Sequence, residues 1–284
     1  MNISNQLSII TFFSLPTLCE ASHNVAKTNT TVNLGIGLVN QGKKVLAIDS
    51  DAQSDLTISL GWRDPEQLNI TLATLMKEAI MDEPIHTKEA ILHHPEGIDL
   101  LPADLELSAM EMSLVTTMSR EYVLKRVIQD LKQDYDYILI DTAPSLGMIT
   151  INALAAADGT IIPVQAQFLS AKGMTELVKT IGKIKRQINP SLEIEGIILT
   201  MADVRTNMTK TVAETIREQY GSALKIYRNV IPFAIAAAET SAEGQSIYTH
   251  AKGSKVAKAY EAFTKEVLLN AEKQRTQARS AQCR

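Results

Sequence analysis

The chain has 284 residues, of which 45% are hydrophobic and 21% charged, an ordinary composition for a globular protein with one large α/β domain or two small ones. This balance argues against intrinsic disorder. The formal net charge of -4 excludes a surface that is basic all over, so any binding of DNA has to come from a local basic patch or from an assembled dimer.

The chain begins with an apolar segment at residues 8–18. No Lys or Arg precedes it, so the basic region of a signal peptide is missing, and it is shorter than the roughly 20 residues that span a bilayer. A buried first strand is therefore the favoured interpretation. Cys19 and Cys283 have no metal-ligand neighbours in the sequence, which favours a reduced, cytoplasmic setting.

Short β-branched apolar runs alternate with longer amphipathic stretches along the rest of the chain. We expect strands at residues 44–48, 98–101, 137–140, 160–163, 194–200 and 229–231. We expect helices at residues 30–41, 106–117, 120–133, 147–156, 171–188, 209–220 and 254–271. Continuous hydrophobic strands are typical of sheets covered on both faces, so the pattern predicts an α/β fold with a doubly wound, mainly parallel sheet. Residues 1–271 are expected to form one domain and residues 272–284 a basic, frayed tail.

Three groups of polar residues fall where ligands of such sheets bind, at strand ends and at the start of a helix. Lys27 and Thr28 open the first expected helix, as at the end of a phosphate loop. Asp49 and Asp51 follow the strand at 44–48, although a plain polar turn explains this segment equally well. Asp141 ends the strand at 137–140, as a Walker B carboxylate does.

Together these groups resemble the ParA/Soj family of Walker-type partitioning ATPases, from about residue 25 to residue 268. Residues 42–53 are similar to the family's switch I and residues 141–147 to its switch II. Residues 152–158, 162–165, 199–201 and 230–233 also match. The resemblance implies the P-loop NTPase fold of the deviant Walker A class.

The resemblance also implies roles for individual residues. Lys27 would contact the phosphates of ATP, and Thr28 would ligate Mg²⁺. Asp51 would support the attacking water, Asp49 would lie beside the metal shell, and Asp141 would hold Mg²⁺ through water. The implied cofactor-binding residues are Ala26, Lys27, Thr28, Asn29, Asp49, Asp141 and Phe233, the last near the adenine pocket.

The partners implied by the resemblance are a second copy of the chain, DNA and an adaptor protein. Members of this family sandwich two ATP molecules in a homodimer that binds DNA non-specifically, and a ParB-like centromere-binding protein stimulates hydrolysis. The expected location is the cytoplasm, on the nucleoid. Membrane binding is not expected, because the C-terminal segment lacks a clear amphipathic anchor.

The phosphate loop departs from the family's Lys-Gly-Gly-Val-Gly-Lys-Thr-Thr. Ser22 stands at the signature lysine, His23 and Asn24 replace two glycines, and Asn29 replaces a hydroxyl residue. Residues 3–6 resemble the strand end that normally precedes this loop. Either an insertion or frame disturbance placed residues 7–24 there, or residues 8–14 form the first strand and 15–24 a remodelled loop. The alternative function is that of a degenerate pseudo-ATPase, an interaction module or inactive copy.

The expected DNA-binding side departs as well. Ala236 stands where many relatives carry an arginine that contacts DNA, and losing one such contact weakens binding without abolishing it. Basic residues on the helix expected at 171–188 offer a substitute, or simply a solvated face. They are Lys179, Lys183, Lys185 and Arg186.

Overall fold

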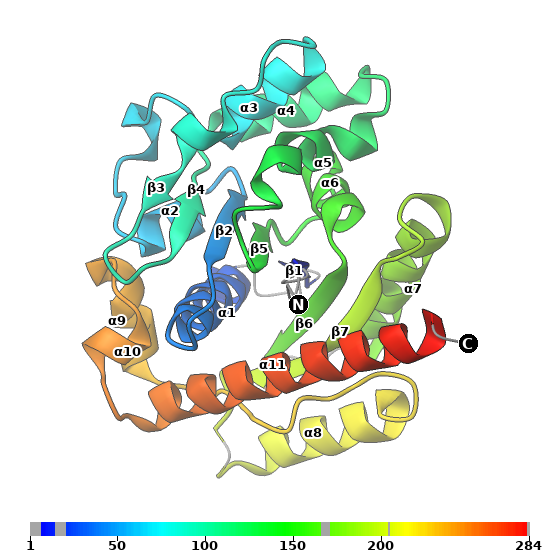
Figure 1. The fold of residues 1–284 in the computed structure, drawn as a ribbon. Helices are drawn as coiled ribbons and strands as arrows, with labels where there is room; N and C mark the ends of the chain where they lie inside the picture. The colour runs from blue at the N-terminus through cyan, green and yellow to red at the C-terminus, as the bar shows by residue number, and fades with distance from the viewer. Residues whose placement is uncertain (1–6, 15–20, 166–170, 204, 283–284) are drawn as a thin grey trace.

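The computed structural model describes residues 7–14, 21–165, 171–203 and 205–282. The strands in these ranges are β1 (Ser8–Phe12), β2 (Val45–Ser50), β3 (Leu92–His93), β4 (Asp99–Leu101), β5 (Tyr137–Thr142), β6 (Gly159–Gln165) and β7 (Glu193–Thr200). Within the described residues they form a seven-stranded sheet in the order β3-β4-β2-β5-β1-β6-β7 (Figure 1). The β3–β4 pairing is antiparallel and the other pairings are parallel, which confirms the predicted doubly wound, mainly parallel fold.

Strand β1 lies inside the sheet, between β5 and β6. It pairs with β5 from Ser8 opposite Tyr137 to Phe12 opposite Asp141, and with β6 on its other side. Ile9 is 2% exposed and Phe12 is fully buried. The expectation of a buried first strand in the apolar N-terminal segment is therefore confirmed. Residues 3–6, which resemble another strand end, and residues 15–20 lie outside the described residues.

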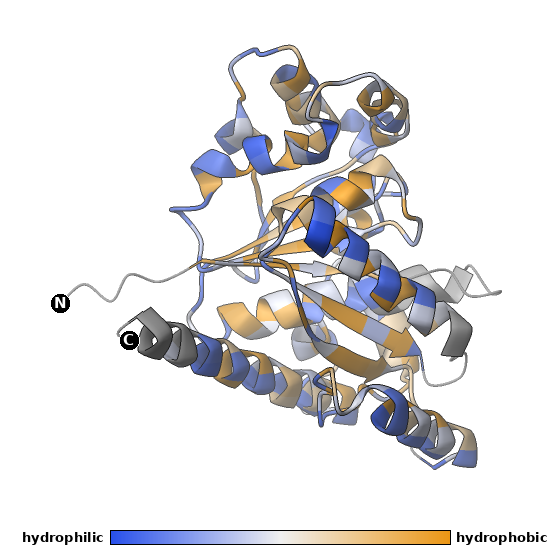
Figure 2. Ribbon diagram, turned by 90° about the vertical axis from the view of Figure 1, so that its right-hand side faces the viewer, coloured by the Kyte–Doolittle hydropathy of each residue, from blue (hydrophilic) through white to orange (hydrophobic). Residues whose placement is uncertain are grey.

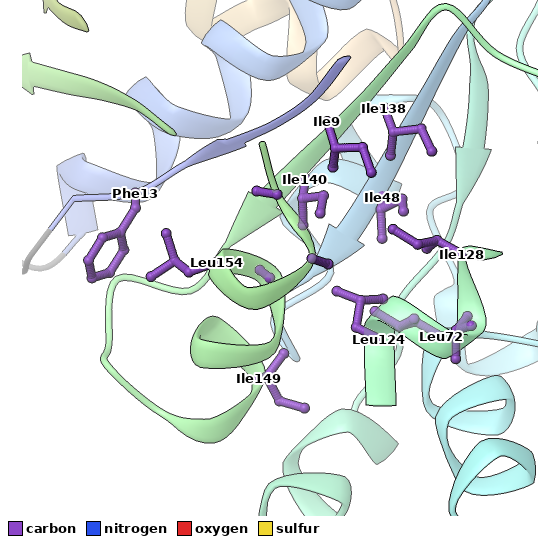
Figure 3. Close-up of a cluster of buried hydrophobic side chains, with 14 of the residues drawn as sticks. Ile9, Phe13, Ile48, Leu72, Leu124, Ile128, Ile138, Ile140, Ile149 and Leu154 are labelled. Atoms are coloured by element: carbon purple, nitrogen blue, oxygen red, sulfur yellow. The ribbon is translucent and has the colours of Figure 1, made fainter. Parts of the chain in front are cut away.

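Each central strand contributes side chains to two separate cores, because successive residues of a strand point to opposite faces. Along β5, Ile138 and Ile140 belong to one core, while Tyr137 and Leu139 belong to the other. Figure 3 shows the first core, where Ile138 and Ile140 lie near Ile48 and other aliphatic side chains. Burial on both faces explains why the strands read as continuous hydrophobic runs.

Helices cover both faces of the sheet (Figure 1). The first core lies under α3 (Leu72–Ile80), α4 (Glu106–Val115), α5 (Val123–Val127), α6 (Met148–Ala156) and α7 (Ala171–Gln187). The second lies under α1 (Ala21–Val39), α10 (Ile247–His250) and α11 (Lys255–Gln282), with α9 (Ile235–Glu243) beside them. The remaining helices are α2 (Asp55–Ser59) and α8 (Asn207–Tyr220), with 3-10 turns at Pro65–Gln67, Thr87–Ala90, Arg120–Tyr122 and Gln129–Leu131. None of the helices in the described ranges is both long and apolar enough to cross a bilayer.

Two expected elements differ in the structure. The helix expected at residues 120–133 is divided into two 3-10 turns and the short α5. Here the side chain of Asn152 accepts the Leu124 N–H at 3.0 Å, and the Thr87 hydroxyl donates to the Val127 carbonyl at 3.1 Å. The strand expected at residues 229–231 is absent from the described structure, and isolated bridges at Ile226 and Pro232 take its place.

The boundaries of two helices also differ from those expected from the sequence. The helix expected at residues 30–41 begins at Ala21 and ends at Val39. The helix expected at 254–271 continues as α11 to Gln282, through most of the segment expected to be a frayed tail. The division of the chain at residue 271 stays a prediction.

Helix α11 docks through an apolar stripe at helical spacing. Val256, Tyr260, Phe263 and Val267 are each 2% exposed or less, and hydrophobic positions alternate with hydrophilic ones along the helix in Figure 2. The Phe263 ring meets the Tyr227 ring edge-on, with 4.9 Å between centroids. This contact ties α11 to the segment that follows α8.

Removal of the Phe263 ring tests how much this docking stabilises the fold. Phe263→Ala is expected to lower the free energy of unfolding by about 3–5 kcal/mol, because a fully buried ring leaves a cavity. Leu269→Ala on the same helix is the control, since Leu269 is 57% exposed. Urea titration of both variants measures the difference, and equal losses would contradict the proposed docking.

Candidate functional site

The carboxyl ends of β2 and β5 place two buried carboxylates side by side. Asp49 and Asp141 are register partners across the two strands and are 0% and 2% exposed. Two carboxylates close together in a dry environment resist ionisation. Burial and the charge of Asp141 raise the pKa of Asp49 to about 8, against the hydrogen bonds from Thr57. Burial likewise raises the pKa of Asp141 to about 6, against the charge of Lys27.

Lys27 brings a buried positive charge to these carboxylates. Its side chain is 1% exposed, and its ammonium nitrogen donates to the Thr142 carbonyl at 2.6 Å. Burial lowers the pKa of Lys27, while the charges of Asp141, Asp51 and Asp55 act in the opposite direction. The structure thus brings Lys27 to the end of β5, next to the predicted Walker B carboxylate.

Both oxygens of Asp141 accept hydrogen bonds from helix α1. The Thr28 hydroxyl donates to Oδ2 at 2.7 Å, and the Thr31 hydroxyl donates to Oδ1 at 3.1 Å. Thr28 and Asp141, the two predicted metal-binding residues, are therefore in direct contact. A hydroxyl and a carboxylate are oxygen donors of the kind that Mg²⁺ prefers.

Asp49 is held by a different set of donors. Its Oδ2 accepts the Thr57 N–H at 2.8 Å and the Thr57 hydroxyl at 2.7 Å, and its Oδ1 accepts the Asp51 N–H at 3.2 Å. The Thr57 hydroxyl in turn accepts the Ala103 N–H at 3.1 Å. These bonds join the ends of β2 and β4 through α2. In this arrangement Asp49 orients the backbone that carries Asp51.

Asp51 lies at the edge of a cavity of about 320 Å³. The Asp51 side chain is 7% exposed, and its Oδ1 accepts the Gln53 N–H at 3.0 Å. The cavity is formed by the segment after β2, the segment after β5, and helices α4 and α6. Its lining includes Ser50, Asp51, Ala52, Glu111, Ser145 and Thr150. Asp51 is thus the predicted catalytic residue that faces open space.

Helix α1 differs from the helix of a phosphate loop in where it begins. Lys27 and Thr28 lie inside the helix, which starts at Ala21. Backbone N–H groups in the interior of an α-helix bond to the carbonyl four residues earlier, and only those of the first turn are free. The backbone of Lys27, Thr28 and Asn29 is therefore not a free anion cradle in this structure.

The remaining predicted residues are more dispersed. Ala26 belongs to α1, but its side chain lies outside the described structure. Asn29 is 4% exposed, and its Oδ1 accepts the Ser241 hydroxyl of α9 at 3.1 Å. Phe233 is 55% exposed and follows a bridge between Ala202 and Pro232, beyond β7. Asn29 thus connects α1 to α9, and the ring of Phe233 is available to a ligand.

Thr31 and Thr57 are site residues that the sequence did not single out. Thr31 follows Lys27 by one helical turn, so the i, i+4 spacing could have placed its hydroxyl beside Asp141. Thr57 carried no such signal, because its bond to Asp49 depends on the turn that separates β2 from α2. Among the described residues, no group of three or more His, Cys, Asp or Glu side chains could hold a metal. Mg²⁺ with a nucleotide needs no such group, since phosphates supply its other ligands.

Comparison with known proteins gives consistent matches over most of the chain. A family model described as an AAA domain matches residues 20–194. The sporulation initiation inhibitor protein Soj of Bacillus subtilis (strain 168) is 37% identical over 246 residues, covering 87% of this chain and 94% of that protein. The chromosome partitioning protein ParA of Caulobacter vibrioides (strain NA1000 / CB15N) is 34% identical over 247 residues, covering 86% and 90%.

Solved structures share the fold. The crystal structure of cobyrinic acid a,c-diamide synthase from Mycobacterium smegmatis with bound ATP analog and magnesium has a TM-score of 0.79 and 30% sequence identity. The match covers 94% of this chain and 96% of that one. The similarity therefore extends over nearly all of the chain.

The raised pKa of Asp49 makes stability depend on pH. A carboxyl group that binds its proton more tightly when folded destabilises the fold as pH rises from its unfolded value near 4 towards about 8. Between pH 6 and pH 8 the free energy of unfolding is expected to fall by about 2 kcal/mol. Asp49→Asn should flatten this slope in urea titrations, whereas Asp64→Asn, at an exposed position, should not. An unchanged slope in Asp49→Asn would contradict the assignment.

Ser54 carries backbone strain beside this site. Its φ of 56° and ψ of 28° are left-handed, and its buried hydroxyl has no hydrogen-bond partner among the described residues. Ser54→Gly is expected to raise the free energy of unfolding by about 1 kcal/mol, because glycine adopts this conformation freely. Ser59→Gly in helix α2 should lower it by about 1 kcal/mol instead. Thermal unfolding of both variants measures the contrast.

Proposed function

Because this chain belongs to the ParA/Soj family, we propose that it is a partitioning protein whose state is controlled by ATP and Mg²⁺. In this proposal the ATP-bound form is a homodimer that binds DNA non-specifically in the cytoplasm, on the nucleoid. A ParB-like adaptor returns it to the free form. The contact of Lys27, Thr28 and Asp141 at the end of β5 is the observation on which the proposal rests.

The donors in this cluster fit a magnesium nucleotide. Thr28 and Asp141 offer hydroxyl and carboxylate oxygens for Mg²⁺, directly or through water. Lys27 offers an ammonium group that can pass from the Thr142 carbonyl to a phosphate oxygen. Bound Mg·ATP would supply the phosphoryl group that is hydrolysed and the negative charge that Lys27 neutralises.

The backbone before Lys27 fits the phosphates less well. A phosphate loop presents free N–H groups, whereas residues 21–26 are helical here. Binding of the β-phosphate therefore requires this first part of α1 to open. The loss of the glycines at His23 and Asn24 works against such an opening, since glycine adopts loop conformations most readily.

Asp51 is the proposed catalytic carboxylate. It faces the 320 Å³ cavity, and the Asp49 carboxylate accepts its backbone N–H. A carboxylate in this position can orient a water molecule for attack on a phosphoryl group. Asp49 holds the backbone of Asp51 in place, and Thr57 holds Asp49.

The proposed DNA-binding surface includes helix α7. Lys179 pairs with Glu176 at 3.4 Å, and Lys185 pairs with Glu193, so acidic neighbours reduce the charge of both. Lys183 and Arg186 are exposed on the same helix. With Ala236 at the position of the family's arginine, the proposal requires only weak DNA affinity from each subunit. Dimerisation would double the number of phosphate contacts.

A second candidate is an interaction module that does not bind nucleotide. Helix α1 favours this candidate. Its backbone is helical from Ala21 to Lys27, and the buried Lys27 ammonium already donates to the Thr142 carbonyl, so these groups have hydrogen-bond partners without a ligand. The two candidates differ in one measurable property, namely affinity for Mg·ATP.

Calorimetry with Mg·ATP separates the two candidates. The proposal expects Mg²⁺-dependent binding by the native chain, and loss of that dependence in Asp141→Asn. A variant with Ser22→Lys, His23→Gly and Asn24→Gly restores the signature lysine and the first two glycines of the family's loop and should bind at least about tenfold more tightly, because free N–H groups then reach the phosphates. Binding by this variant alone would overturn the proposal and favour the interaction module.

A further inference from the structure

The first turn of α6 receives a hydrogen-bonding partner from another helix. The residue before it, Gly147, has no side chain to cap the helix. Instead, the carboxylate of Glu111 on α4 accepts the N–H of Met148 through Oε1 and that of Ile149 through Oε2, the latter at 3.1 Å. A carboxylate at this position satisfies free N–H groups and complements the positive end of the helix dipole.

Gly147 allows the carboxylate to come this close. A Cβ atom at Gly147 would lie 2.3 Å from Oε1 of Glu111 and 2.9 Å from its carboxyl carbon. The backbone of Gly147 has φ of -83° and ψ of 178°, an extended conformation open to any residue. A side chain at position 147 would therefore displace the Glu111 carboxylate, through contact and not through backbone strain.

The position of α6 fixes one end of the segment at residues 141–147. Its other end carries Asp141, which binds Thr28 and Thr31, and the Thr142 carbonyl, which binds Lys27. Glu111 also lines the 320 Å³ cavity that Asp51 faces. A shift of Glu111 would thus move the segment that forms one wall of the candidate site.

We propose that Glu111 is a positioning residue, which holds residues 141–147 in place from helix α4. This role rests on the proposed function, in which residues at the start of the 141–147 segment bind Mg·ATP. Glu111 accepts hydrogen bonds from the first turn of α6, so it acts on the candidate site through that turn. A residue that only capped the helix would stabilise α6 without affecting the candidate site at the other end of the 141–147 segment.

The test uses the full chain and four variants: Glu111→Ala, Gly147→Ala, the double variant, and Glu106→Ala as an exposed control on the same helix. Hydrogen exchange of residues 142–149 is measured without nucleotide, and the Kd of Mg·ATP is measured by calorimetry. Glu111→Ala should speed exchange in this segment about tenfold, as expected for loss of a helix cap. It should also weaken Mg·ATP binding about tenfold, through misplacement of the segment.

The double variant identifies the route of the effect. Gly147→Ala alone should resemble Glu111→Ala, because its methyl group displaces the carboxylate. In the double variant that clash is absent, so the effects should not add. Additive effects, or exchange in Glu111→Ala equal to that in Glu106→Ala, would overturn the proposal. So would faster exchange with an unchanged Kd, which indicates a helix cap only.

If neither the native chain nor any variant binds Mg·ATP, the proposed function fails, and the Glu111 proposal, which rests on it, is overturned with it. The exchange data would then still show whether Glu111 holds the segment.

Discussion

The structure depends on the burial of two carboxylates beside one ammonium group at the carboxyl ends of β2 and β5. Burying charge is costly unless it is paired and hydrogen-bonded. Asp141 is paired with Lys27 and bonded to Thr28 and Thr31, whereas Asp49, with its pKa raised to about 8, keeps its proton at neutral pH and is bonded to Thr57. Helices α1 and α2 supply those partners, which explains why both lie close against these strand ends.

The same constraint links stability to function. Groups that satisfy one another in the free chain must exchange partners before a ligand can bind. In the proposed complex with Mg·ATP, the Lys27 ammonium would leave the Thr142 carbonyl, and Asp141 would share its oxygens with the metal. A ligand has to compete with hydrogen bonds that already stabilise the fold. Its net affinity is therefore set by the difference in free energy between the complex and the free chain, in which the same polar groups are already hydrogen-bonded.

Hydrophobic pattern predicted the fold class and placed the main acidic residues at strand ends, because both depend on local sequence, and the resemblance to the ParA/Soj family gave these residues their expected roles. Asp49 and Asp141 lie side by side as the parallel sheet requires. What the pattern missed depends on contacts between distant segments. The break at residues 120–133 follows from bonds to Asn152 and Thr87, and the start of α1 at Ala21 extends through the expected loop. Glu111 reaches α6 across an interface that no spacing in the sequence indicates.

Strand β1 has a consequence for how such proteins change. Between β5 and β6, this strand requires only a short apolar sequence that can be buried, because hydrogen bonding to its two neighbours sets its direction and register. A phosphate loop, in contrast, requires particular residues at particular positions. The sheet therefore keeps its architecture although residues 22–24 depart from the sequence of a phosphate loop. Architecture and phosphate binding depend on different residues at this end of the chain.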